Sequence, residues 1–93
     1  MKIPFHKPIF PEDLNPIIKE SIDSGWVTTG PKVEEFEKQF SEYLCAEHVI
    51  AVNSGTAALH LALAAKGIGI GDKFVVPTYT FIASVEAGEY LGA

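Results

Sequence analysis

The chain has 93 residues, 47% of them hydrophobic, and carries a formal net charge of −5. Its seven lysines are scattered and it has no arginine, so the clustered positive charge that nucleic-acid binding needs is missing. One cysteine excludes an internal disulfide, and no apolar run suits a signal peptide or a membrane span. We therefore expect a cytoplasmic protein that binds neither nucleic acid nor membranes.

The first thirty residues read as an arm, a helix and a loop. Residues 1–10 contain Pro4 and Pro8, which remove backbone donors and favour an extended arm. A helix is expected from the acidic first turn that starts at residue 11, because apolar residues then recur at helical spacing. Gly25 is expected to end that helix, and WVTTGP follows as a loop.

A second helix is expected from Pro31, where an apolar stripe is flanked by charged residues that face water. The stripe consists of Val33, Phe36, Phe40, Tyr43 and Leu44. Cys45 comes directly after it. We interpret this cysteine as a small buried apolar group and not as a nucleophile.

The second half of the chain alternates apparent strands and helices. Residues 48–52 (HVIAV) and 73–76 read as buried strands, and residues 56–66 and 81–91 read as helices. Strands that are separated by single helices indicate a parallel sheet, so we predict an α/β fold with an incomplete sheet. The helix at 56–66 is apolar on nearly every side, and we expect protein to cover it all round.

The junction Asn53-Ser54-Gly55-Thr56 joins the first expected strand to its helix. In open α/β sheets, ligands bind at the carboxyl ends of strands, and a helix start offers free N–H groups to an anion. Gly55 lets a ligand approach the backbone, while Ser54 and Thr56 add hydroxyl donors. The alternative is that Ser54 or Thr56 only caps the helix, and the local pattern leaves both interpretations open.

The second strand end carries Tyr79 and Phe81. The ring of Phe81 could stack on a planar ligand there, or it could pack in the core. The three histidines, His6, His48 and His60, lack the spacing of metal ligands, so no metal site is predicted.

Several motifs in order resemble one enzyme family. They are SGWVTTGP at residues 24–31, VEEFEKQF, NSGTAALHLAL, GIGDK and VPTYTFIASVEA. Together they cover nearly the whole chain and resemble the N-terminal quarter of the DegT/DnrJ/EryC1/StrS sugar aminotransferases. These enzymes depend on pyridoxal 5'-phosphate and have the aspartate aminotransferase (type I) fold. By this resemblance, residues 1–30 form an arm, a helix and an active-site loop, and residues 31–93 begin the large cofactor-binding α/β domain.

The resemblance also implies roles for particular residues. The turn Ser54-Gly55-Thr56-Ala57 resembles the family's cup for the cofactor phosphate, and Phe81 stands where the family places an aromatic ring against the pyridine. The loop bordering the bound sugar nucleotide is matched by Trp26, Thr28, Thr29 and Gly30. Family members act as homodimers on nucleotide-linked keto sugars in polysaccharide biosynthesis, with glutamate as the usual amino donor.

One part of the family pattern is not found. No lysine of this chain stands in the motif of the lysine that binds the cofactor covalently, so no catalytic residue is assigned and we expect a shortened form that is inactive alone. Two alternatives remain open. The full-length enzyme that this chain resembles could be a sugar dehydratase of the same family. Alternatively, the chain could be a non-enzymatic module that binds a phosphate or a partner.

Overall fold

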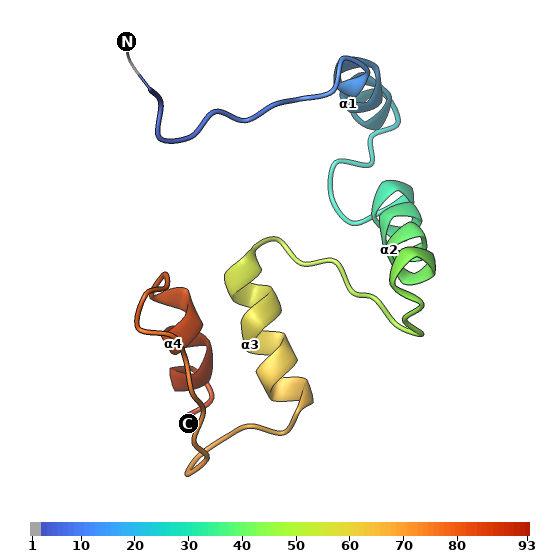
Figure 1. Cartoon of the computed structure of the whole chain (residues 1–93). Coiled ribbons are helices and arrows are strands. Elements are labelled where there is room, and N and C mark those ends of the chain that lie inside the picture. The colour runs from blue at the N-terminus through green and yellow to red at the C-terminus, as the bar shows by residue number, and fades with distance from the viewer. Residues whose placement is uncertain (1–2) are drawn as a thin grey trace. The chain divides into compact units, whose positions relative to one another are not determined.

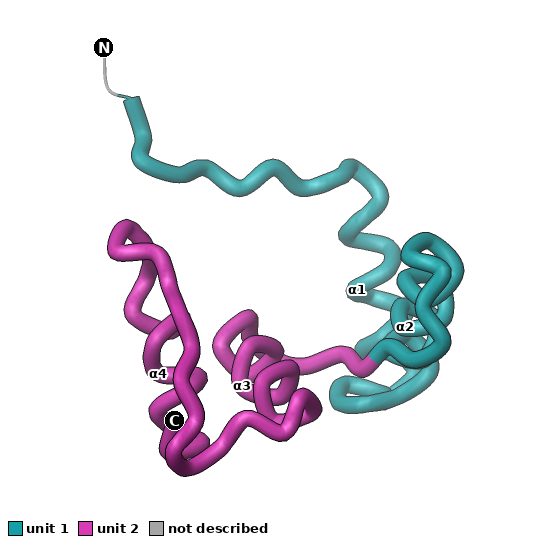
Figure 2. Tube along the Cα trace, turned by 60° about the horizontal axis from the view of Figure 1, so that its bottom comes forward, with its two compact units in different colours: residues 1–49 teal, residues 50–93 magenta. Residues whose placement is uncertain are grey.

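The computed structural model describes residues 3–93, and its regular structure consists of helices (Figure 1). They are α1 (Leu14–Asp23), α2 (Pro31–Leu44), α3 (Gly55–Ala65) and α4 (Ala83–Glu89). The chain divides into two compact units, residues 1–49 and residues 50–93 (Figure 2). The division expected from the resemblance, between residues 30 and 31, refers to the family's complete fold and stays a prediction.

Helix α1 confirms the first expected helix, although it begins at Leu14, so the expected acidic first turn precedes the helix. Lys19 and Asp23, one helical turn apart on its exposed surface, form an ion pair of 2.6 Å. Gly25 adopts a φ of +76° and ends the helix, as predicted. Residues 3–10, at the expected arm, form no helix or strand and their side chains are exposed.

Helix α2 confirms the second expected helix and starts with Pro31 at its first position. Its aromatic stripe is continuous, with 5.3 Å between the ring centroids of Phe36 and Phe40. The interpretation of Cys45 as buried is wrong. This residue is exposed and ends the helix with a left-handed φ of 52°, donating its N–H to the carbonyl of Glu42.

Residues 50–93 are organised around the contact between α3 and α4, which lie side by side (Figures 1 and 2). Small residues of α4 make this packing close, since Ala83, Ala87 and Gly88 are buried. The ring of Phe74 lies directly against Gly88, where an added Cβ would clash. The rings of His60 on α3 and of Tyr90, which follows α4, meet edge to face at a centroid distance of 5.6 Å.

The two expected strands are absent, because residues 48–52 and 73–76 have no strand assignment within residues 3–93. A strand exists only where its N–H and C=O groups pair with a neighbouring strand. No such pairing is present among the described residues, and Ile50 and Val75 are correspondingly exposed. The α/β class is therefore found here only in its helices.

The expectation that protein covers the apolar helix all round is also wrong. Helix α3 has no fully buried residue, and about half of the surface of Leu59 and of Leu61 is exposed, at 45% and 50%. The reason is that α4 packs on one side only. None of the helices within residues 3–93 is long and apolar enough to cross a membrane.

Candidate functional site

Ser54 is the N-cap of α3, so the capping interpretation of the junction is confirmed for this residue. Its backbone is extended and its Oγ accepts the N–H of Ala57 at 3.1 Å. The carbonyl of Ser54 accepts the N–H of Ala58, also at 3.1 Å, which is the first bond of the helix. The start of α3 is thus held firmly by the local sequence.

Two donors remain at this helix start. The backbone N–H groups of Gly55 and Thr56 have no hydrogen-bond partner among the described residues. A Cβ added at Gly55 would meet no atom within 4 Å, so the space above its backbone is open. Free N–H groups beside open space, at the positive end of a helix, are suited to an anion.

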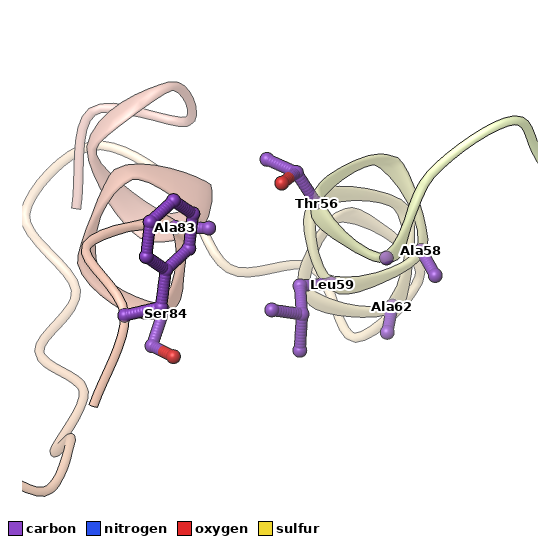
Figure 3. A pocket seen from close by; sticks show the side chains of 8 residues that line it. Thr56, Ala58, Leu59, Ala62, Ala83 and Ser84 are labelled. Carbon is purple, nitrogen blue, oxygen red and sulfur yellow. The ribbon is translucent and has the colours of Figure 1, made fainter. Parts of the chain in front are cut away.

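A hollow of about 680 Å³ lies between α3 and the start of α4 (Figure 3). It is lined by Gly55, Thr56, Ala58, Leu59, Ala62, Phe81, Ala83 and Ser84. In Figure 3, Leu59 extends from α3 toward the part of α4 that carries Ala83 and Ser84. The hollow has a polar end at the start of α3 and is otherwise mainly apolar, so it suits a ligand with an anionic group and a flat apolar body.

Phe81 lines this hollow, whereas the sequence analysis had left packing in the core as an alternative. The residue is 76% exposed, and its carbonyl accepts the N–H of Ser84 at 3.0 Å in the turn that opens α4. The sequence analysis selected Gly55 and Thr56 after the first expected strand and Phe81 after the second. The structure brings all three to one hollow. Ser54 and Ala57 flank it without lining it.

Several lining residues escaped the sequence analysis. Residues 55, 58, 59 and 62 follow one face of a helix, and this spacing from Gly55 could have identified them. Ser84 was missed because nothing local marks it; Thr80 Oγ1 lies 2.9 Å from its Oγ. None of the lining residues is titratable, and no group of three metal-ligating side chains occurs within residues 3–93.

The expected sugar-nucleotide loop lies in the other unit. The ring of Trp26 packs on Gly30, where an added Cβ would come within 2.8 Å of Trp26 Cε3. Trp26 also lines a small hollow with Lys32, whose Nζ pairs with Glu20 Oε2 at 3.1 Å. Thr28 and Thr29 are exposed.

Comparisons with known proteins identify the family of this chain. Residues 9–93 match the model of the DegT/DnrJ/EryC1/StrS aminotransferase family. The spore coat polysaccharide biosynthesis protein SpsC of Bacillus subtilis is 42% identical over 91 residues, which are 98% of this chain and 23% of that protein. The GDP-perosamine synthase of Vibrio cholerae is 41% identical over 92 residues, which are 98% of this chain and 25% of that enzyme.

A solved structure also matches this chain. The sugar aminotransferase Spr1654 of Streptococcus pneumoniae, described as putative and solved in its PLP form, matches all of this chain with a TM-score of 0.90 and 38% identity. The match covers 24% of that protein, and the chain spans about a quarter of the length of the relatives it matches. The family match extends over nearly the whole chain, and the chain belongs to the DegT/DnrJ/EryC1/StrS aminotransferase family.

Proposed function

We propose that these residues form the phosphate-binding end of a pyridoxal-phosphate-dependent sugar aminotransferase. One observation carries the proposal: the N–H groups of Gly55 and Thr56 have no hydrogen-bond partner among the described residues, and both residues line the hollow at the start of α3. Neither a left-handed turn nor tight packing requires glycine at this place, since Gly55 has no positive φ and no close neighbour among the described residues. An open backbone at this place is suited to the close approach of a ligand.

The residues present fit the cofactor. Gly55 and Thr56 would donate their N–H groups to the phosphate, and the Ser54 hydroxyl, which already accepts the N–H of Ala57, still has its own proton to donate. Phe81 would lie against the pyridine ring from the other side of the hollow. When bound, the cofactor supplies an electron sink through which an amino group can pass between an amino acid and a carbonyl compound.

The substrate is proposed from the relatives. One relative is named a GDP-perosamine synthase, another is named a spore coat polysaccharide biosynthesis protein, and a third is described as a putative sugar aminotransferase. We therefore propose that the whole protein transfers an amino group from glutamate to a nucleotide-linked keto sugar and acts as a homodimer. Trp26, Thr28, Thr29 and Gly30 would border the sugar nucleotide.

The described residues are not proposed to carry out this reaction alone. None of the residues lining the hollow is a lysine, and no lysine stands in the family's cofactor-binding motif. We expect the purified chain to transfer no amino group from glutamate, since a lysine must hold the cofactor and move the proton. Detectable transfer by this chain would contradict the expectation.

The phosphate site can be tested by titrating the ¹⁵N-labelled chain with pyridoxal phosphate and with inorganic phosphate. We expect the amide signals of Gly55 and Thr56 to shift with both probes. Gly55→Ala serves as the comparison, because its methyl group would fill the open space without a clash. We expect the variant to unfold at the same or a slightly higher temperature, because alanine favours helices by about 1 kcal/mol over glycine, and to bind both probes more weakly. Unchanged binding would contradict the site.

A further inference from the structure

The turn that carries Phe81 into the hollow is closed by a pair of hydroxyl groups. Thr80 Oγ1 lies 2.9 Å from Ser84 Oγ, and either atom can be the donor. The two residues are four apart and enclose Phe81, whose carbonyl accepts the N–H of Ser84. Ser84 itself lines the hollow and is labelled there in Figure 3.

Little else holds the Phe81 ring in place. Phe81 is 76% exposed, so packing within residues 50–93 restrains its side chain weakly. The start of α4 has no side-chain cap, because Ile82 occupies the N-cap position. The direction of the Phe81 side chain therefore depends on the backbone of this turn, and the Thr80–Ser84 bond is the one side-chain link across it in the described part of the chain.

We propose that Thr80 and Ser84 are positioning residues that direct Phe81 over the ligand in the hollow. The inference rests on the proposed function for the identity of that ligand. A hydrogen bond that closes the turn reduces the conformations of Phe81 before binding, and preorganisation of this kind raises affinity without a new contact. The pair acts on the ring and not on the phosphate, because Gly55 and Thr56 belong to the separate start of α3.

Two variants at Thr80 separate the hydroxyl from the rest of the side chain. Thr80→Val keeps the branched shape and loses the hydrogen bond, while Thr80→Ser keeps the hydroxyl. In the ¹⁵N,¹³C-labelled chain, three-bond couplings report the χ1 rotamer of Phe81. We expect one dominant rotamer in the wild type and in Thr80→Ser, and averaged couplings in Thr80→Val.

Affinities provide the second measurement. We expect Thr80→Val to bind pyridoxal phosphate roughly three- to tenfold more weakly, the range that one neutral hydrogen bond supplies, and to bind inorganic phosphate as the wild type does. Thr80→Ser should restore the affinity. If Thr80→Val does not fold, Ser84→Ala removes the same bond from the other side and takes its place.

Each outcome decides one question. Identical Phe81 couplings in the wild type and Thr80→Val, or averaged couplings in the wild type, would overturn the positioning role. Equal weakening of inorganic phosphate and pyridoxal phosphate would also overturn it, since it would indicate a general loss of structure. If neither probe shifts the amide of Gly55 in the wild type, the proposed phosphate site fails, while the couplings still decide the role of Thr80 and Ser84.

Discussion

Ser54 begins α3 with its side-chain oxygen, and the proposed function gives the same side chain a second task. Sequence reasoning left capping and phosphate binding as alternatives, but a hydroxyl can accept one hydrogen bond and donate another. The observed cap uses only the acceptor, at 3.1 Å from the N–H of Ala57. The two interpretations are therefore compatible, and substitutions can separate them.

Ser54→Asp should keep the cap and abolish phosphate binding. Aspartate caps helices as well as serine does, and its charge favours a helix start, but it repels an anion. Ser54→Ala should instead lower the free energy of unfolding by about 1 kcal/mol, the usual cost of a lost cap. Thermal unfolding and phosphate titration of both variants check this prediction. Wild-type phosphate affinity in Ser54→Asp would show that the side chain only caps.

Tyr90 provides a prediction about pH. The negative charge of Glu86 raises the pKa of Tyr90 above its ordinary value of 10.0, and burial, a hydrogen bond to Glu86 and the charge of Glu89 act in the same direction. The Tyr90 hydroxyl lies 3.4 Å from Glu86 Oε2. Because the folded state holds the proton more tightly, this contribution to stability is complete below pH 10 and is lost as the pH rises through the folded pKa.

Glu86→Gln should lower the pKa of Tyr90 toward its ordinary value, since the largest cause of the shift is removed. The ring signals of Tyr90, followed by NMR from neutral to alkaline pH, measure the change directly. Glu89→Gln is the matched control and should produce a smaller decrease, because Glu89 is the weakest of the causes. Equal titration of the wild type and Glu86→Gln would contradict the assigned cause.

Among the elements, α4 depends on a glycine in its last turn. An added Cβ at Gly88 would clash with the ring of Phe74, which lies directly against it. Gly88→Ala should therefore displace this ring, at a cost of about 1–3 kcal/mol, partly offset by about 1 kcal/mol of helix propensity. We expect a lower melting temperature by circular dichroism.

The double variant Phe74→Ala/Gly88→Ala isolates the clash. Without the ring there is nothing for the new methyl group to displace, so Gly88→Ala should no longer destabilise the chain in a Phe74→Ala background. A stabilising effect of Gly88→Ala alone would show that Phe74 moves aside freely.

The helices were predictable and the strands were not, for one physical reason. A helix satisfies its backbone within a few residues, so the stripe from Val33 to Leu44 was enough to predict α2. A strand depends on a neighbour that may be far away in the chain, and the apolar run at residues 48–52 contains no information about whether that neighbour is present. The exposure of Cys45 likewise depends on tertiary contacts that local sequence does not encode.

Of the residues that line the hollow, the sequence indicated Gly55, Thr56 and Phe81 but not the rest. Gly55 and Thr56 could be selected because a glycine and hydroxyl residues at a helix start have a known use. Ala58, Ala62 and Ser84 are ordinary residues in sequence, and only the packing of α3 beside α4 gives them a common surface. Phe81 was selected as an aromatic residue just past an expected strand end, with the core as its alternative, and its place in the hollow follows from the turn before α4.

At the scale of the whole molecule, the comparisons show the family, and the roles of the two units are proposed. The relatives match nearly all of this chain, yet the match covers about a quarter of each of them. The hollow belongs to residues 50–93 and the loop around Trp26 belongs to residues 1–49. The proposed cofactor and sugar-nucleotide contacts therefore come from separate units of the chain.

The exposed apolar side chains favour association of the molecules in solution. Leu59, Leu61, Ile50 and Val75 are open to solvent, and surfaces of this kind associate unless charge keeps the molecules apart. The net charge of −5 arises from twelve carboxylates against seven lysines, and protonation of the carboxylates removes it. Light scattering on a dilute sample should therefore show assemblies that grow as the buffer is acidified, and dissolved salt should favour them at neutral pH by screening the same repulsion.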